Sequence, residues 1–86
     1  MSWYVYILRC KDNTLYTGTT NDPAGRLSAH RAGKGAKYTK GRGPLEMVRL
    51  EQWDSKTLAF QREYEIKQMS RQEKIALIGD QEPFEP

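Results

Sequence analysis

The chain contains five side chains whose chemical types together suit the cleavage of a phosphodiester bond. They are two phenols, a guanidinium, an imidazole and a carboxylate: Tyr6, Tyr16, Arg26, His30 and Glu63. A carboxylate can hold a divalent ion, a guanidinium can stabilise charge on a phosphate, and an imidazole or a phenol can move a proton. Because the five are far apart in the sequence, the chemistry depends on whether the fold brings them together.

The register of one hairpin decides whether the two tyrosines can cooperate. The segments around Tyr6 and Tyr16 alternate in the manner of strands, and a polar turn separates them. In an antiparallel pair the partner numbers have a constant sum, and only an even sum places both tyrosines on one face. A two-residue turn gives a sum of 25 and separates them, whereas a three-residue loop ending in a left-handed Asn13 gives 24. The second register, which sets Gly18 opposite Tyr6, is the one that the chemistry requires.

The rest of the pattern predicts a small sheet covered by helices. Strands are expected over about residues 3–10, 15–20 and 45–52, and helices over about residues 23–32, 55–68 and 71–78. Pro23 and Gly33 mark the two ends of the first helix, while Ser70 and Gly79 mark those of the last. The order ββαβαα predicts an α+β fold with a three-stranded antiparallel sheet flanked by three helices.

Length and composition predict one domain without a membrane segment. With 86 residues, we expect a single domain over residues 1–80, followed by a flexible C-terminal tail over residues 81–86. One cysteine, Cys10, excludes an internal disulfide and fits a small buried hydrophobe in a reducing cytoplasm. No apolar stretch approaches the length of a membrane span, and the N-terminus lacks the pattern of a secretory signal. The expected location is therefore the cytoplasm.

Positive charge is concentrated in one segment of the chain. Residues 23–45 contain no acid but hold Arg26, Arg31, Lys34, Lys37, Lys40 and Arg42, and the remaining chain has 8 basic against 11 acidic residues. Glycines and Tyr38 are interleaved with these charges. Such a segment most often binds a phosphate backbone, although a solvated basic face has the same composition. The predicted partner is nucleic acid.

Helical spacing directs Glu63 toward the interior. It follows Ala59 by four residues and precedes Ile66 by three, so it shares the apolar sector of its helix. A buried carboxylate needs a counter-charge or a metal ion. A salt bridge to Arg26 or Arg62 satisfies this need as well as a divalent ion does.

The order of these residues resembles the GIY-YIG nuclease family. That family pairs a Gly-Ile-Tyr strand with a Tyr-Ile-Gly strand, followed by an Arg on a helix, a His or Tyr one turn later, and a metal-binding Glu. The resemblance covers residues 3–78. Within the family, the chain is similar to the small stand-alone bacterial members, the YhbQ-like group. Tyr4 stands in place of the first motif glycine and Thr17 in place of the isoleucine, and both departures concern packing more than chemistry.

The resemblance implies a role for each residue. Tyr6 would assist the attacking water, and Tyr16 would orient the site. Arg26 would stabilise the developing phosphate charge, and His30 would move a proton. Glu63 would be the sole protein ligand of Mg²⁺ or Mn²⁺. The substrate-binding residues would be Gly18, Lys34, Lys37, Tyr38, Lys40 and Arg42.

Tyr6 can move a proton at neutral pH only if its surroundings assist it. A tyrosine is a poor base at neutral pH, because the pKa of a free phenol is about 10. It becomes useful if a cation such as Arg26 favours the phenolate, or if the hydroxyl relays a proton.

These observations predict a metal-dependent nuclease that hydrolyses DNA, with a possible role in DNA repair or processing. The chain has no room for a separate specificity domain, so we expect low sequence specificity unless a protein partner supplies targeting. A nucleic-acid-binding module without turnover is the alternative, and an interaction domain for an acidic protein is a third. The inward-directed Glu63 favours the nuclease, since a pure binder has no need of it.

Overall fold

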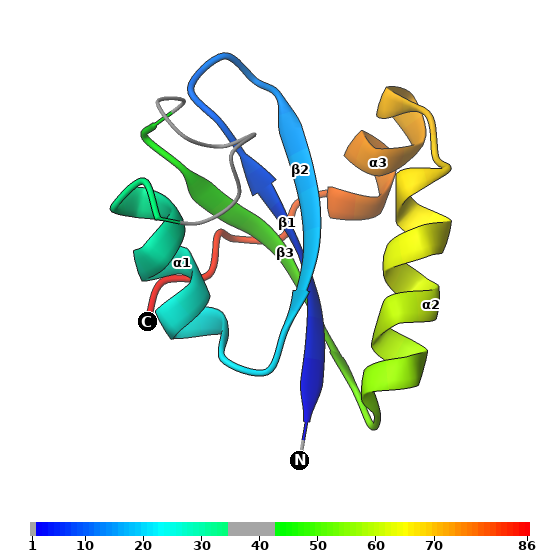
Figure 1. The fold of residues 1–86 in the computed structure, drawn as a ribbon. Helices are drawn as coiled ribbons and strands as arrows, with labels where there is room; N and C mark the ends of the chain where they lie inside the picture. The colour runs from blue at the N-terminus through cyan, green and yellow to red at the C-terminus, as the bar shows by residue number, and fades with distance from the viewer. Residues whose placement is uncertain (1, 35–42) are drawn as a thin grey trace.

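A three-stranded antiparallel sheet forms the centre of the molecule. The computed structural model describes residues 2–34 and 43–86. The central strand β1 (Trp3–Arg9) pairs with β2 (Leu15–Thr20) on one side and with β3 (Glu46–Trp53) on the other. Helix α1 (Pro23–Arg31) covers one face, and α2 (Lys56–Lys67) and α3 (Arg71–Ile78) cover the other (Figure 1). The predicted α+β class and the order ββαβαα are confirmed.

The hairpin has the odd loop that the tyrosine hypothesis required. Tyr6 pairs with Gly18 and Leu8 pairs with Tyr16, so the even register is confirmed. Asn13 has a left-handed φ of 66°, and its backbone N–H donates to the Cys10 carbonyl at 2.9 Å. Asparagine tolerates this conformation better than most residues, which explains why the loop closes here. The even-numbered residues of β1 and β2 therefore face α1.

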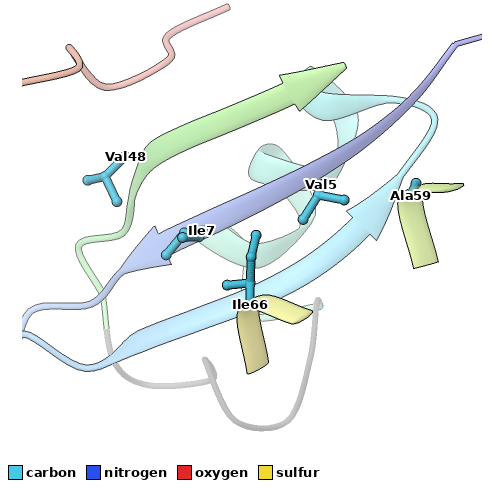
Figure 2. Close-up of a cluster of buried hydrophobic side chains, with 5 residues drawn as sticks. All are labelled: Val5, Ile7, Val48, Ala59 and Ile66. Carbon is cyan, nitrogen blue, oxygen red and sulfur yellow. The ribbon is translucent and has the colours of Figure 1, made fainter. Parts of the chain in front are cut away.

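Two hydrophobic clusters hold the layers together, one on each face of the sheet. Toward α2, Val5 and Ile7 of β1 meet Ala59 and Ile66 of α2, together with Val48 (Figure 2). Toward α1, the buried cluster is Tyr6, Leu8, Leu27 and Met47. The first cluster contains no polar side chain, whereas the second includes a phenol. The polar chemistry of the core is thus placed on the α1 face.

Side-chain caps position the three helices. The Asp22 side chain accepts from the Gly25 N–H at the start of α1, and Ser55 accepts from the Leu58 N–H at the start of α2. Ser70 and the side chain three residues later form a capping box at the start of α3, and Gly79 ends that helix with a φ of 54°. These caps fix where each helix begins, as the sequence predicted.

A charged network ties α2 and α3 to β3. Glu51 accepts hydrogen bonds from Arg62 at 2.9 and 3.1 Å, from Arg49 at 2.8 Å and from the Trp53 indole at 3.2 Å. Arg49 also donates to the Leu77 carbonyl of α3 at 3.0 Å. Burial acts to raise the pKa of the Glu51 carboxyl, but the hydrogen bonds and charges of Arg62 and Arg49 outweigh it and lower this pKa.

The C-terminal segment contacts the α1 side of the molecule. Phe84 donates its N–H to the Met47 carbonyl at 2.8 Å and packs against the α1-facing cluster. Glu85 forms an ion pair with Arg31 at 2.6 Å. The segment predicted as a flexible tail therefore has two defined contacts with the domain.

Candidate active site

Tyr6, Tyr16 and His30 form an aromatic cluster between the sheet and α1. The ring centroids of the two tyrosines lie 6.4 Å apart, and those of Tyr16 and His30 lie 5.6 Å apart. Arg26 and His30 come from two consecutive turns of α1. They share one face of the helix because they are four residues apart. The fold therefore brings the predicted phenols, imidazole and guanidinium together.

The Tyr6 hydroxyl is the centre of this cluster. It lies 3.0 Å from Nε2 of the buried His30, and it accepts a hydrogen bond from Nε of Arg26 at 3.4 Å. A hydroxyl has one hydrogen to donate, and a neutral imidazole has one nitrogen that accepts. The geometry thus allows Tyr6 to donate to His30 while its oxygen accepts from Arg26.

The pKa shifts favour neutral forms of both partners. Burial raises the pKa of the Tyr6 phenol, and the hydrogen bond from Arg26 opposes this rise without cancelling it. Arg26 acts toward the phenolate, but desolvation is the stronger effect, so of the two alternatives the raised pKa favours a neutral phenol that relays a proton. Burial also lowers the pKa of His30, and the Arg26 charge lowers it further, so the imidazole is neutral at neutral pH.

Gly18 lies directly beneath the end of the Tyr6 ring. A Cβ at position 18 would stand 2.5 Å from Cζ of Tyr6, a separation that no real side chain tolerates. The absence of a side chain at Gly18 permits this close approach, and the group that approaches is the Tyr6 phenol. Whether substrate also contacts Gly18 stays a prediction.

Glu63 lies on the opposite face of the sheet from the tyrosines. Its carboxylate accepts a hydrogen bond from the Thr19 hydroxyl of β2 and forms an ion pair with Lys67 at 2.7 Å. Its side chain is 17% exposed, so the predicted inward direction is correct. The alternative of a salt bridge to Arg26 or Arg62 is not what the structure has, since Glu63 pairs with Lys67 and Arg62 binds Glu51.

The two parts of the site meet at β2. Thr19 holds Glu63 on the α2 face, and its neighbour Gly18 supports Tyr6 on the α1 face. The Glu63 charge still acts on Tyr6, because it contributes to the raised pKa of the phenol. Whether all these groups border a single cavity stays a prediction. β2 is an edge strand of the sheet and lies between α1 and α2 (Figure 1).

The Glu63 carboxylate is the kind of oxygen ligand that magnesium binds. Residues 2–34 and 43–86 hold no group of three or more His, Cys, Asp or Glu that could bind a metal. Magnesium often uses one or two carboxylates and completes its shell with water and phosphate oxygens, so a single partly exposed carboxylate suffices. A metal ion bound through Oε2 would compete with the Lys67 ion pair.

The predicted substrate-binding loop is described only at its start. Lys34 follows α1 and is exposed, with its backbone N–H bonded to the Ala29 carbonyl at 2.8 Å. The others, Lys37, Tyr38, Lys40 and Arg42, lie outside the described residues.

Two residues that interact with Glu63 were missed from the sequence. Lys67 lies four residues after Glu63, a spacing that favours an ion pair and was available as a signal. Thr19 belongs to the odd-numbered, α2-facing set of β2, but nothing in the sequence indicated that its partner would come from α2.

Comparison with known proteins gives the family. The GIY-YIG catalytic domain matches residues 2–76 of the chain. The chain belongs to the GIY-YIG family. The matched residues include the strand hairpin, the arginine and histidine of α1 and the glutamate of α2.

Relatives of this GIY-YIG protein are small proteins of similar length. UPF0213 protein OB0043 of Oceanobacillus iheyensis is 56% identical over 79 residues, which is 92% of each chain. UPF0213 protein NP_0776A of Natronomonas pharaonis is 54% identical over 78 residues, or 91% of this chain and 92% of the relative. The predicted likeness to the small stand-alone group is confirmed.

Solved structures share the fold. The solution NMR structure of UPF0213 protein BH0048 from Bacillus halodurans has 50% identity and a TM-score of 0.60, covering 91% of this chain and 83% of that one. The solution NMR structure of protein EF2693 from E. faecalis has 34% identity and a TM-score of 0.63, with the same coverage.

Within residues 2–34 and 43–86, no helix is long and apolar enough to cross a membrane.

Proposed function

We propose that this GIY-YIG protein is a divalent-metal-dependent nuclease that hydrolyses phosphodiester bonds in DNA. The observation that supports it most is the contact of the Tyr6 hydroxyl with both Arg26 and a neutral His30. A structural tyrosine needs one hydrogen-bond partner, whereas this one has a cation on its oxygen and an acceptor for its proton. That arrangement suits a proton relay.

In the proposed reaction Tyr6 moves the proton of the attacking water. As the water oxygen bonds to phosphorus, its proton passes to the Tyr6 oxygen, and the Tyr6 proton passes to His30 Nε2. The phenol stays neutral before and after this exchange, which agrees with its raised pKa. The bond from phosphorus to the leaving oxygen breaks, the leaving oxygen takes a proton from solvent water, and His30 returns its proton to solvent.

Arg26 and Tyr16 would bind and orient the phosphate. The Arg26 guanidinium touches Tyr6 through Nε, which leaves its terminal nitrogens to meet phosphate oxygens. Tyr16 packs against both Tyr6 and His30, so it would hold their rings in the relay geometry. Its own hydroxyl would contact the substrate.

Glu63 would hold Mg²⁺ or Mn²⁺, in competition with Lys67 where the ion binds Oε2. When bound, such an ion supplies Lewis-acid stabilisation of phosphate oxygens and of the leaving oxygen. Thr19 would keep the carboxylate at the β2 edge, because its hydroxyl already donates to it.

The rest of the proposal concerns substrate and context. The predicted substrate contacts, Gly18, Lys34, Lys37, Tyr38, Lys40 and Arg42, would bind backbone phosphates, which gives low sequence specificity. A targeting protein, a cytoplasmic location and a role in DNA repair or processing belong to this proposal as well.

The test is incubation with single-stranded, duplex, flapped and branched DNA, with Mg²⁺, Mn²⁺ or chelator. Tyr6→Phe, Arg26→Ala, His30→Gln and Glu63→Gln should each reduce cleavage about 100-fold or more, because each removes a group from the reaction. Glu46→Gln, an exposed residue of a surface ion pair with Arg9, is the matched control and should cleave normally.

Two outcomes would contradict the proposal. Cleavage that persists in all four variants would remove the mechanism. Salt-sensitive binding with no cleavage under any metal would instead select the nucleic-acid-binding module without turnover.

A further inference from the structure

The outer surface of α2 carries aromatic side chains that the proposed mechanism does not use. Phe60 is 48% exposed and Tyr64 is 67% exposed. Residues four apart share a helix face, so the two rings lie next to each other. With Thr57, Gln61 and Glu65 they line an open hollow of about 660 Å³. Aromatic side chains of this size are usually buried, and their exposure on one helix marks a contact surface.

A cation and an indole extend this surface at the start of α2. Trp3 of β1 packs on Phe60 with ring centroids 6.5 Å apart. Lys56 Nζ lies 5.2 Å from the centroid of Trp3 and 5.7 Å from that of Phe60. The ammonium is thus held at the edge of the aromatic surface, where it can also meet an anion.

The surface adjoins the metal-binding side of the site. Phe60 precedes Glu63 by three residues and Lys67 follows it by four, so all three lie on one flank of the helix. Glu63 faces β2 through Thr19, and this flank is therefore the one nearest the β2 edge. A chain bound at that edge would meet Phe60 and Tyr64 when it continues over α2.

Charge favours nucleic acid as the occupant. Lys56 borders the aromatic side chains, with Nζ 5.7 Å from the ring centroid of Phe60, whereas Lys67 is paired with Glu63. The nearby Glu65 carboxylate lies 3.8 Å from Arg62, which offsets its charge. Exposed aromatics beside cations are the combination that stacks unpaired bases and binds their phosphates.

We propose that Phe60 and Tyr64, with Lys56, stack an unpaired nucleotide beside the scissile phosphate. The location of this site rests on the proposed nuclease function, whereas its ability to bind single strands does not. Bases in a continuous duplex are already stacked on each other and cannot reach the rings. The preferred substrate is therefore DNA with a single-stranded segment, such as a flap or a branch.

The test is fluorescence anisotropy of a labelled oligothymidylate and of a duplex of equal length, with chelator present so that no cleavage occurs. Phe60→Ala and Tyr64→Ala should each weaken single-strand binding about 5- to 100-fold, the range for loss of one stacked base. Phe60→Tyr and Tyr64→Phe keep a ring and should bind normally. Ile75→Ala is the control, because it removes an apolar side chain of α3 that is 50% exposed and lies outside the proposed stacking site.

A second readout locates the contact directly. The Trp3 indole N–H signal in an NMR titration should shift with the oligothymidylate and not with the duplex. Circular dichroism of each variant shows whether it is folded. Cleavage of flapped DNA by folded Phe60→Ala should show a raised KM with little change in kcat, because the ring binds a flanking nucleotide.

Three results would overturn the inference. Phe60→Ala and Tyr64→Ala that bind single strands as well as Ile75→Ala does would remove the stacking site. Equal loss of duplex binding would remove the preference for unpaired bases. Concentration-dependent dimers that Phe60→Ala dissociates, without an effect on DNA, would make the surface a contact between copies of the chain. Failure of the nuclease proposal can be told apart from failure of the stacking site. In that case no DNA is cleaved, but Phe60→Ala and Tyr64→Ala still weaken the binding of single strands.

Discussion

Lys67 Nζ lies 2.7 Å from Oε2 of Glu63, so the proposed metal ligand is paired with a lysine one turn further along α2. The lysine side chain is 49% exposed, so this ion pair is only modestly stable. A divalent ion that binds Oε2 has to compete with this pair, while Oε1 accepts from the Thr19 hydroxyl.

Replacement of Lys67 should therefore strengthen metal binding. We expect Lys67→Met to raise the affinity for Mn²⁺ about 2- to 5-fold, because an exposed pair is worth up to about 1 kcal/mol. The free Mn²⁺ signal in electron paramagnetic resonance measures this without any turnover. Lys11→Met, in the β1–β2 loop, is the control of equal charge, and a similar gain in it would mean that the effect is long-range. Glu63→Gln should abolish the binding.

A methyl group at Gly18 should disturb Tyr6. In Gly18→Ala the new Cβ would overlap the phenol, so the Tyr6 ring must move away from His30. We expect a loss of about 1–3 kcal/mol in the free energy of unfolding, the usual cost of overpacking, with a larger loss of cleavage. Urea denaturation and cleavage assays measure the two effects. Gly43→Ala, whose Cβ would meet nothing within 4 Å, should change neither.

His30 should make the stability of the fold depend on pH. Its pKa is lowered from 6.5 by burial and by the Arg26 charge, so the unfolded chain binds a proton more readily than the folded one. The free energy of unfolding should therefore fall as the pH drops below about 6.5. The groups that face His30 in the described structure are Tyr6, Tyr16 and Arg26, and none of their free forms titrates between pH 5 and 7.5.

Urea unfolding between pH 5 and 7.5 measures this dependence. His30→Gln has no imidazole to protonate, so its free energy of unfolding should change less over the same range. An equal slope in the wild type and in His30→Gln would show that other groups cause the dependence.

Glu51 should stabilise the fold down to acidic pH. Its pKa is lowered, so its contribution is complete above the unfolded-state pKa of about 4.5 and is lost as the pH falls through the folded value. We expect Glu51→Gln to cost about 1.5–3 kcal/mol at pH 7, since it removes hydrogen bonds between charged groups. Thermal unfolding at pH 7 and below 4 measures this, and the difference should shrink at the lower pH. Glu46→Gln removes a surface pair with Arg9 and should cost less than about 1 kcal/mol.

Thr17 should be replaceable by valine with a gain in stability. Its hydroxyl is buried on the α2 side of β2 and has no hydrogen-bond partner among the described residues. Valine has the same shape without the unsatisfied group, so Thr17→Val should gain about 1 kcal/mol in the free energy of unfolding. Thr17→Ser keeps the hydroxyl and loses the methyl group, and it should be less stable than the wild type.

The sequence predicted most of the fold because its local signals agree with one another. The turn left two hairpin registers open, and the structure has the one with a loop ending in Asn13, which places Tyr6 and Tyr16 together. Pro23 and the Ser70 capping box gave the starts of two helices. The small shift of β3, which begins and ends one residue later than predicted, concerns boundaries that patterns define poorly.

The position of Glu63 on the opposite face of the sheet from Tyr6 was not predictable in the same way. Helical spacing showed that Glu63 points inward, but not which face of the sheet α2 would cover. That choice depends on how Val5, Ile7, Ala59 and Ile66 pack, which is a long-range property. The pKa of Tyr6 was also out of reach, because desolvation depends on the whole cluster around the ring.

In the described structure β2 pairs only with β1, which has a consequence for how an anion could be received. An edge strand leaves every second main-chain amide without a partner in the sheet, and these amides point away from β1. Amide hydrogens are good donors to phosphate oxygens, and no side-chain replacement removes them. Replacement of any single lysine or arginine should thus lower the affinity for a nucleic acid only in part, because backbone amides of β2 would still donate hydrogen bonds to phosphate oxygens.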